Sequence, residues 1–449
     1  MAENWDLLIT GGEVFTPAGL APAAVAVKDG RIADIGDLNP GGAAEVFDAS
    51  GLTVLPGVID TQVHFREPGL DHKENLESGT RAAVLGGVTA VFEMPNTSPA
   101  TIDAAALNDK LSRARGRAWC DHAFFIGAAA ENADKLGELE RLPGCCGVKI
   151  FMGSSTGSLL VADDDTLLAA LSSGTRRVAI HSEDEERLRE RFELVRDGAN
   201  VDQHPVWRDE ETALRSTRRI LKLARKAGRR LHVLHITTAD EMPILAANKD
   251  VATVEVTPQH LTLAAPDCYE RLGSLAQMNP PIRDERHRAG LWEGIRRGIV
   301  DVVGSDHAPH SREEKAADYP RTPSGMPGVQ TLLPLLLDHL NAGRLTLPRL
   351  VDLTSAGAQR IYNIARKGRI AVGYDADFTV VDLKARREIT GDWLASQCGW
   401  SPFEGMTVTG WPMATIIRGQ IVMREDELPG EPAGVPVQFM ETLPRGTAG

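Results

Sequence analysis

The sequence predicts an α/β protein: a (β/α)8 TIM barrel with a small composite β-sandwich-like domain formed by both termini. Eight apolar, β-rich runs alternate with helical stretches through the middle of the chain, and such alternation indicates a parallel sheet. Shorter β-rich runs broken by turns occupy both ends. The length of 449 residues suits a barrel of about 250 residues or more with a satellite domain.

The predicted barrel strands are short and rich in Val, Ile and Phe. They lie in residues 58–65, 88–95, 120–129, 147–152, 177–183, 230–237, 251–260 and 301–307. Helical patterns separate most of them, for example at residues 72–87 and 209–228. Eight such units favour a closed barrel over an open sheet. We therefore assign residues 57–367 to the barrel domain.

The two ends of the chain share a different texture, in which short β-rich runs alternate with turns. Asp29-Gly30 lies between two such runs and is a strong hairpin signal. Similar runs return at residues 366–383 and 413–425. Because the N-terminal part alone is short for an independent domain, we predict that residues 1–56 and 368–449 together form one composite β domain.

Composition narrows the class of protein. Hydrophobic residues make up 42% and charged residues 25% of the chain, as in ordinary globular enzymes. The formal charge of −13 argues against a nucleic-acid or anionic-membrane surface. The five cysteines lack C-x-x-C pairs, and the N-terminus lacks the regions of a signal peptide. We expect a cytoplasmic enzyme with reduced thiols and a small-molecule substrate, without nucleic-acid or membrane partners, assembled as a homo-oligomer (dimer or tetramer).

Metal-competent side chains lie in the predicted barrel strands or at their ends: His64, Lys149, His181, His235 and Asp306. In a parallel barrel the carboxyl ends of all strands converge on one face. Imidazole and carboxylate ligands suit Zn²⁺, which activates water for attack on a stable carbonyl. Asp306 is placed to carry a proton to a departing nitrogen. The pattern indicates metal-dependent amide hydrolysis.

Each of these residues also has a structural interpretation. A single histidine in an apolar strand is more often a hydrogen-bonded core residue, and we assign His122 and His232 that role. His232 and His235 differ by three positions, so they point to opposite faces of a strand; we favour His235, although the sequence leaves the choice open. Lys149 could instead pair with a carboxylate, and Asp306 could cap a helix.

Longer motifs carry a family resemblance. The segment VIDTQVHFREPGLDHKENLESGTRAAVLGGVTAVFEMPNTSPAT resembles the first two barrel strands of dihydroorotases, within the amidohydrolase superfamily. GVKIFMGSSTG, HSED, LHVLHITT, VTPQHL, MNPPIR, DVVGSDHAPH and SGMPGVQTLLPLLL follow in the family's order. The resemblance spans residues 5–420 and is more specific for the superfamily than for the substrate.

The resemblance implies a metal centre. His64 would bind the more buried ion, and Lys149 matches the position of a carboxylated lysine that bridges two ions in relatives. His181 and His235 would hold the second ion, while Asp306 would be both ligand and proton shuttle. The implied cofactor is zinc, as one or two ions, with carboxylation of Lys149 as a further possibility.

The resemblance also implies a set of substrate-binding residues. Arg66 in FREPG, Asn96 in MPNT and His310 in DHAPH match the residues that recognise the substrate carboxylate in dihydroorotases, and Asn279 in MNPPIR joins them. Their chemistry agrees, because arginine offers a bidentate fork to a carboxylate.

One position departs from the superfamily pattern. The first strand normally carries two histidines separated by one residue, and this chain has Gln62 in place of the first. A neutral amide oxygen is a weaker zinc ligand than imidazole. Gln62 is therefore a candidate ligand at a centre of either two ions or one ion on the His181/His235 side.

Three functions follow from these patterns. The first is dihydroorotase activity, the reversible hydrolysis of dihydroorotate to N-carbamoyl-aspartate in pyrimidine biosynthesis. The second is an allantoinase or a hydantoinase/dihydropyrimidinase-type ring opener. The third is a catalytically silent homologue with a structural role, for which Gln62 is the main support. Arg66 and Asn96 favour a substrate that bears a carboxylate.

Overall fold

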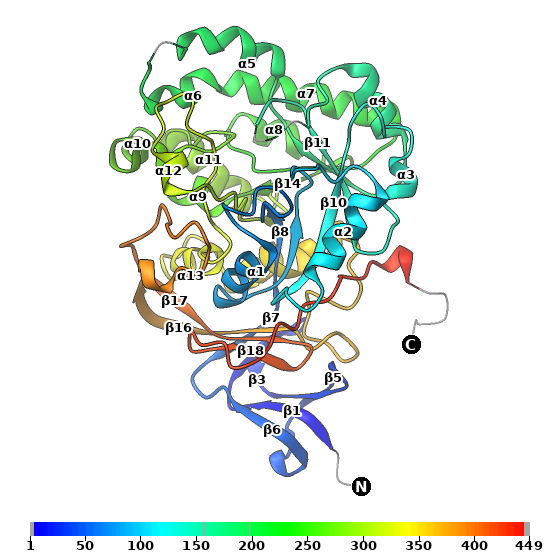
Figure 1. The fold of residues 1–449 in the computed structure, drawn as a ribbon. Helices are drawn as coiled ribbons and strands as arrows, with labels where there is room; N and C mark the ends of the chain where they lie inside the picture. The colour runs from blue at the N-terminus through cyan, green and yellow to red at the C-terminus, as the bar shows by residue number, and fades with distance from the viewer. Residues whose placement is uncertain (1–3, 156, 158, 197, 444–449) are drawn as a thin grey trace.

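A computed structural model describes residues 4–155, 157, 159–196 and 198–443. It shows a parallel barrel surrounded by helices, with small sheets packed below it (Figure 1). The barrel strands pair in sequence order, and a parallel bridge between Val63 and His307 joins the first strand to the segment after the last. The predicted fold class is confirmed.

Each predicted barrel run overlaps one observed strand, and β11 begins two residues before its run. The strands are β8 (Val58–Val63), β9 (Val88–Glu93), β10 (Asp121–Gly127), β11 (Cys145–Phe151), β12 (Val178–His181), β13 (Leu231–Val233), β14 (Ala252–Val256) and β15 (Val302–Val303). Every residue of these strands is buried, as expected for a parallel sheet with helices outside and packed side chains within.

The helices lie outside this ring. They are α1 (Leu76–Leu85), α2 (Ala104–Ala114), α3 (Leu136–Leu139), α4 (Asp164–Ser172), α5 (Glu185–Arg191), α6 (His204–Trp207), α7 (Glu210–Ala227), α8 (Glu241–Ala246), α9 (Pro258–Thr262), α10 (Asp267–Leu272), α11 (Glu285–Arg296), α12 (Arg312–Lys315), α13 (Leu332–Asn341), α14 (Leu347–Val351) and α15 (Gly357–Tyr362). The side chain of Asp209 caps α7 by accepting from the backbone of Thr212, and Gly228 ends the helix with a φ of 67°. These are the usual start and stop residues of a helix.

Strands from both ends of the chain build the small domain. One sheet has the order β5-β4-β1-β6 and the other β18-β17-β16-β7-β2-β3. Their bounds are β1 (Trp5–Thr10), β2 (Glu13–Thr16), β3 (Gly19–Pro22), β4 (Ala24–Lys28), β5 (Arg31–Gly36), β6 (Ala43–Asp48), β7 (Thr53–Pro56), β16 (Phe378–Glu388), β17 (Thr407–Ile417) and β18 (Gln420–Arg424). β7 pairs antiparallel with β16, so N- and C-terminal strands share one sheet. The boundaries at residues 56/57 and 367/368 stay predictions.

The C-terminal segment leaves the small domain and follows the barrel. The backbone of Val437 donates to His122 of β10, and His122 donates to Val435. Phe439 is buried against the rings of Phe92 and other core residues. All five cysteines are free and buried. None of the helices in the described ranges is long and apolar enough to cross a membrane.

Candidate active site

A small buried cavity lies at the carboxyl ends of the barrel strands. It is lined by Gln62, His64, Arg66, Asn96, Lys149, Phe151, Ser155, His181, His235, Asn279, Asp306, Ala308, Ser324 and Gly325. Of the predicted site residues, all except His310 are in this wall, and His310 lies directly behind Arg66. The structure thus brings together residues that are far apart in the sequence.

Three of these residues have an unusual backbone conformation. Arg66, His235 and Asp306 have positive φ angles of 66°, 37° and 45°. For residues other than glycine this conformation costs about 1–3 kcal/mol and concentrates at functional sites. His235 lies beyond the end of β13, where strand alternation no longer fixes its direction. It lines the cavity, whereas His232 lies deeper in the barrel and contacts Thr253 and Glu255.

His181 and His235 form one pair of potential ligands. Nε2 of His181 donates to Glu183 (2.9 Å), which leaves the Nδ1 lone pair facing Nε2 of His235 at 3.1 Å. Burial alone would raise the pKa of Glu183, but the charge of Arg208 and the hydrogen bond from His181 hold it below its usual range. Burial lowers the pKa of both histidines. Both rings are therefore neutral, the form that binds metal ions.

His64 and Asp306 form a second pair. Nδ1 of His64 lies 2.7 Å from the side-chain oxygen of Asn96, and its Nε2 lies 3.2 Å from Oδ1 of Asp306. The amide nitrogen of Gln62 donates to the same Asp306 oxygen (2.8 Å). The oxygen of Gln62 has no hydrogen-bond partner in the described ranges. Gln62 thus contacts Asp306 through its donor and keeps its possible ligand atom unused.

Lys149 contributes a buried amine to the cavity. Its side chain is 1% exposed, and Nζ has no hydrogen-bond partner among the residues that the structure describes. Burial lowers the pKa of Lys149 to about 7, against the opposing charges of Asp306 and Glu255. An unpaired buried amine is costly in a structural role. The structural interpretation of Lys149 required a carboxylate partner, and none of the described residues provides one.

The donor set fits a divalent cation. Two zinc ligands with bonds of about 2.0–2.1 Å in tetrahedral geometry lie about 3.3 Å apart. The 3.1 Å and 3.2 Å separations of the two pairs match this value. Across the described residues, however, no three or more His, Cys, Asp or Glu side chains gather at one metal-sized point. A complete centre would need Lys149 or water as a further ligand.

Arg66 places a cation in the same cavity. It is 1% exposed, and burial lowers its pKa to about 10, so that it is charged at neutral pH. Nε donates to the carbonyl of Pro309 (3.1 Å), and Nη2 lies 3.3 Å from Nε2 of His310. Nη1 has no partner within the described part of the chain. The guanidinium therefore keeps donors available for an anionic ligand.

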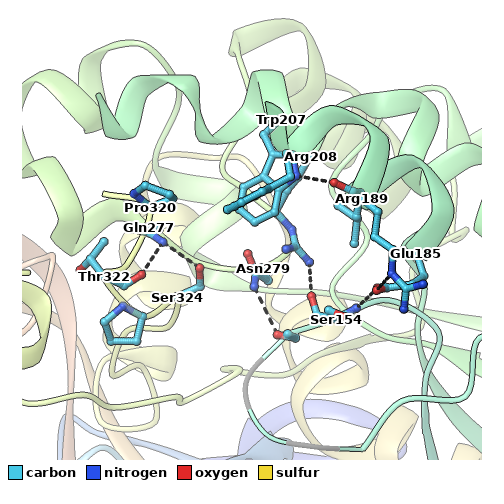
Figure 2. Close-up of a pocket in the computed structure, with 14 residues that line it drawn as sticks. Ser154, Glu185, Arg189, Trp207, Arg208, Gln277, Asn279, Pro320, Thr322 and Ser324 are labelled. Atoms are coloured by element: carbon cyan, nitrogen blue, oxygen red, sulfur yellow. Dashed lines mark hydrogen bonds and ion pairs between the residues drawn. The ribbon is translucent and has the colours of Figure 1, made fainter. Parts of the chain in front are cut away.

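A wider vestibule adjoins the inner cavity, and Figure 2 shows its lining residues. Its volume is about 470 Å³, and it shares Ser155, Asn279 and Ser324 with the inner cavity. Asn279 stands at this boundary, where it donates to Ser155 (3.3 Å) and accepts from His204 (2.9 Å). The vestibule and the inner cavity at the strand ends are therefore adjacent.

Several residues of the site were not identified by sequence reasoning. Glu183 and Arg208 hold His181 through hydrogen bonds, and Ser324 lines both cavities. Glu183 belongs to the HSED motif and Ser324 to SGMPGV. Those motifs were the available signal, but neither indicates which atom each residue contacts.

A parallel barrel with metal-competent side chains at its strand ends defines a class of hydrolytic enzymes, and comparison with known proteins gives the family. The amidohydrolase family model matches residues 53–422. The chain belongs to the amidohydrolase family.

Relatives of two activities are similar to the chain over nearly its whole length. A dihydroorotase of Methanosarcina mazei is 35% identical, with 95% of this chain and 96% of the relative covered. A dihydroorotase of Halobacterium salinarum is 38% identical, with coverage of 89% and 95%. An allantoinase of Escherichia coli is 34% identical, with coverage of 96% and 98%.

Solved structures support the same grouping. The L-hydantoinase (dihydropyrimidinase) from Arthrobacter aurescens superposes with a TM-score of 0.91 at 28% identity, covering 96% of this chain and 99% of that one. The dihydropyrimidinase from Brevibacillus agri gives a TM-score of 0.88 at 28% identity, with coverage of 95% and 97%. The protein is a dihydroorotase-like cyclic amidohydrolase, and this level of the prediction is confirmed.

Proposed function

We propose that the protein is a metal-dependent dihydroorotase, which catalyses the reversible hydrolysis of dihydroorotate to N-carbamoyl-aspartate. One observation carries the choice of substrate: Arg66 is buried, charged and has an unpartnered Nη1 at the cavity. A substrate carboxylate would pair with it. Hydantoin and allantoin lack that carboxylate and would leave the buried charge unpaired, which is costly.

The metal would be zinc, as one or two ions. His181 and His235 would hold one ion through Nδ1 and Nε2, the atoms that face each other at 3.1 Å. His64 and Asp306 would hold a second, with Gln62 as the weaker candidate ligand. Addition of CO2 to neutral Lys149 forms an N–C bond, releases one proton and gives a carbamate anion that could bridge the ions. When bound, the metal supplies Lewis-acid activation of water and of the ring carbonyl.

The residues of the chain then divide the remaining work. Asp306 takes a proton from the attacking water and delivers it to the ring nitrogen as the C–N bond breaks. Arg66 and His310 hold the substrate carboxylate, while Asn96 orients His64 and faces the ring of the substrate. Asn279 lies at the entrance of the cavity. Ring closure follows the same path in reverse.

The alternative substrates have support of their own, since the allantoinase relative is about as similar as the dihydroorotases. The test is to assay one zinc-loaded preparation with dihydroorotate, allantoin and hydantoin. We expect turnover of dihydroorotate to exceed the others by at least about 100-fold, the discrimination that a buried polar group gives against a substrate that leaves it unpaired. Preferential turnover of allantoin would overturn the assignment, and no turnover of any ring would favour the silent homologue.

Two further proposals concern the setting of the enzyme. A cytoplasmic location is supported by the five free, buried cysteines. A homo-oligomeric state, dimer or tetramer, stays a prediction that light scattering of the purified protein would test.

A further inference from the structure

A second cation lies behind the proposed carboxylate site. Lys73 is 8% exposed, and its Nζ lies 3.1 Å from Nδ1 of His310 and 3.0 Å from Glu314. His310 is fully buried, and its other nitrogen, Nε2, faces Arg66 (3.3 Å) and the carbonyl of Ser324 (3.1 Å). His310 therefore connects Lys73 on one side with the cavity cation Arg66 on the other.

The chemistry of these neighbours determines which nitrogen of His310 carries the proton. A lysine ammonium can only donate, so Nδ1 must accept through its lone pair. The Ser324 carbonyl, 3.1 Å from Nε2, can only accept, which places the hydrogen on Nε2. In this tautomer Arg66, which is also only a donor, lies 3.3 Å from Nε2 without a hydrogen bond to it. Glu314 could accept from a protonated Nδ1, but its oxygen is 3.7 Å away, beyond hydrogen-bond length. Burial lowers the pKa of His310 to about 3, with Arg66 and Lys73 adding to the effect. The ring is neutral.

We propose that Lys73 is a positioning residue that holds His310 as the Nε2–H tautomer, so that the ring presents a donor beside Arg66 and selects substrates with an anionic group at that place. The proposal rests on the proposed function, because it explains how the carboxylate site is made. The opposite tautomer would present a lone pair to the carboxylate and repel it. Glu314 compensates the charge of Lys73 and leaves that of Arg66 for the ligand.

The first test needs no substrate. Nitrogen NMR of protein labelled with ¹⁵N-histidine distinguishes the two neutral tautomers, and a His310→Gln variant assigns the signal. We expect Nε2–H in the wild type. In Lys73→Met, which keeps the apolar stem and removes the donor, we expect the proton to move to Nδ1, because Nδ1 no longer accepts from Lys73 and Nε2 can then accept from Arg66. An unchanged tautomer would show that the Ser324 carbonyl suffices and would overturn the proposal, as would a doubly protonated ring that retains full activity.

The second test is kinetic. Lys73→Met should lower kcat/KM for dihydroorotate about 10- to 100-fold, the worth of one hydrogen bond to a charged group. The loss should lie mainly in KM, because the contact serves substrate and transition state alike. Lys73→Arg retains a donor and should stay within about threefold of the wild type. Lys226→Met, which removes an exposed lysine on α7, is the matched control and should change nothing.

A double-mutant cycle separates positioning from a general structural effect. In a His310→Gln background, Lys73→Met should cost no further activity, since both residues act through one contact. Additive losses, or equal losses on hydantoin, would overturn the proposal. If the wild type does not turn over dihydroorotate at all, the proposed function fails, while the NMR experiment still decides the role of Lys73.

Discussion

Two groups of buried polar side chains, one at each end of the barrel, differ in how they are paired. At the amino end, Lys367 contacts three carboxylates: Asp121 (2.6 Å), Asp375 (3.2 Å) and Asp377. Arg418 also pairs with Asp121, and its backbone donates to Asp377 (2.8 Å). Burial alone would lower the pKa of Lys367, but the three carboxylates raise it above its usual range. Every charge in this cluster has a partner.

At the carboxyl end, buried polar atoms lack partners. Nζ of Lys149, Nη1 of Arg66, Oε1 of Gln62 and Nδ1 of His235 have no hydrogen bond to any described residue. Three of these four side chains are cationic or basic, yet none of the carboxylates in the described part of the chain contacts them as Asp121 contacts Lys367. The paired charges of the Lys367 cluster join the barrel to the small domain. The unpaired polar atoms of the cavity indicate a place where a ligand binds.

The largest effect on activity is expected for a change in the cavity at the carboxyl end of the barrel. Asp306→Asn removes the proposed proton carrier and should lower kcat by about 10²–10⁴-fold. The folded protein should be as stable as the wild type or slightly more stable, because asparagine tolerates the positive φ of this position at least as well. Steady-state kinetics and urea unfolding of the same preparation measure both quantities. A stable variant with full activity would remove Asp306 from the mechanism.

A change in the Lys367 cluster should have the opposite effect: a loss of stability with little change in turnover. Lys367→Met leaves Asp121 and Asp377 buried with less compensation, and breaking a buried ion pair typically costs about 3–5 kcal/mol of folding free energy. Turnover per folded molecule should stay within about twofold of the wild type, since the cluster lies at the far end of the barrel from the cavity. Urea denaturation with an activity assay checks this. Lys226→Met again serves as the exposed control, and an inactive but stable Lys367 variant would refute the distinction.

A third substitution tests whether Arg66 determines the choice of substrate. Arg66→Met removes one partner of a desolvated charge pair, which typically costs about 2–5 kcal/mol. We expect kcat/KM for dihydroorotate to fall about 30-fold to a few thousandfold, at about 1.4 kcal/mol per decade. Any turnover of hydantoin should fall far less. Equal losses on both rings would give Arg66 a structural role only.

Much of this architecture follows from the sequence. The eight strand positions were predictable because each strand is a short apolar run between helical segments, and the composite domain because β-rich runs recur at both ends. His232 and His235 could not be separated, since the alternation argument applies within a strand and His235 lies beyond the end of β13 at a positive φ.

The interactions between site residues were not predictable in the same way. Lys73 and His310 are 237 positions apart, and no spacing rule relates them. Gln62 reads as a weak ligand, whereas the structure directs its amide nitrogen to Asp306. Motifs of this family identify which residues meet at the strand ends, but hydrogen-bond direction depends on contacts between distant segments.

The most consequential proposal is that a metal ion binds between His181 and His235 at the carboxyl end of the barrel. Anomalous diffraction at the zinc edge, measured on crystals of zinc-loaded protein, tests it most directly. The account predicts a peak within about 2.0–2.3 Å of Nδ1 of His181 and Nε2 of His235. It would be contradicted by a fully loaded crystal without a peak at these atoms, or with His181, His235 and Asp306 more than about 6 Å apart around the ion.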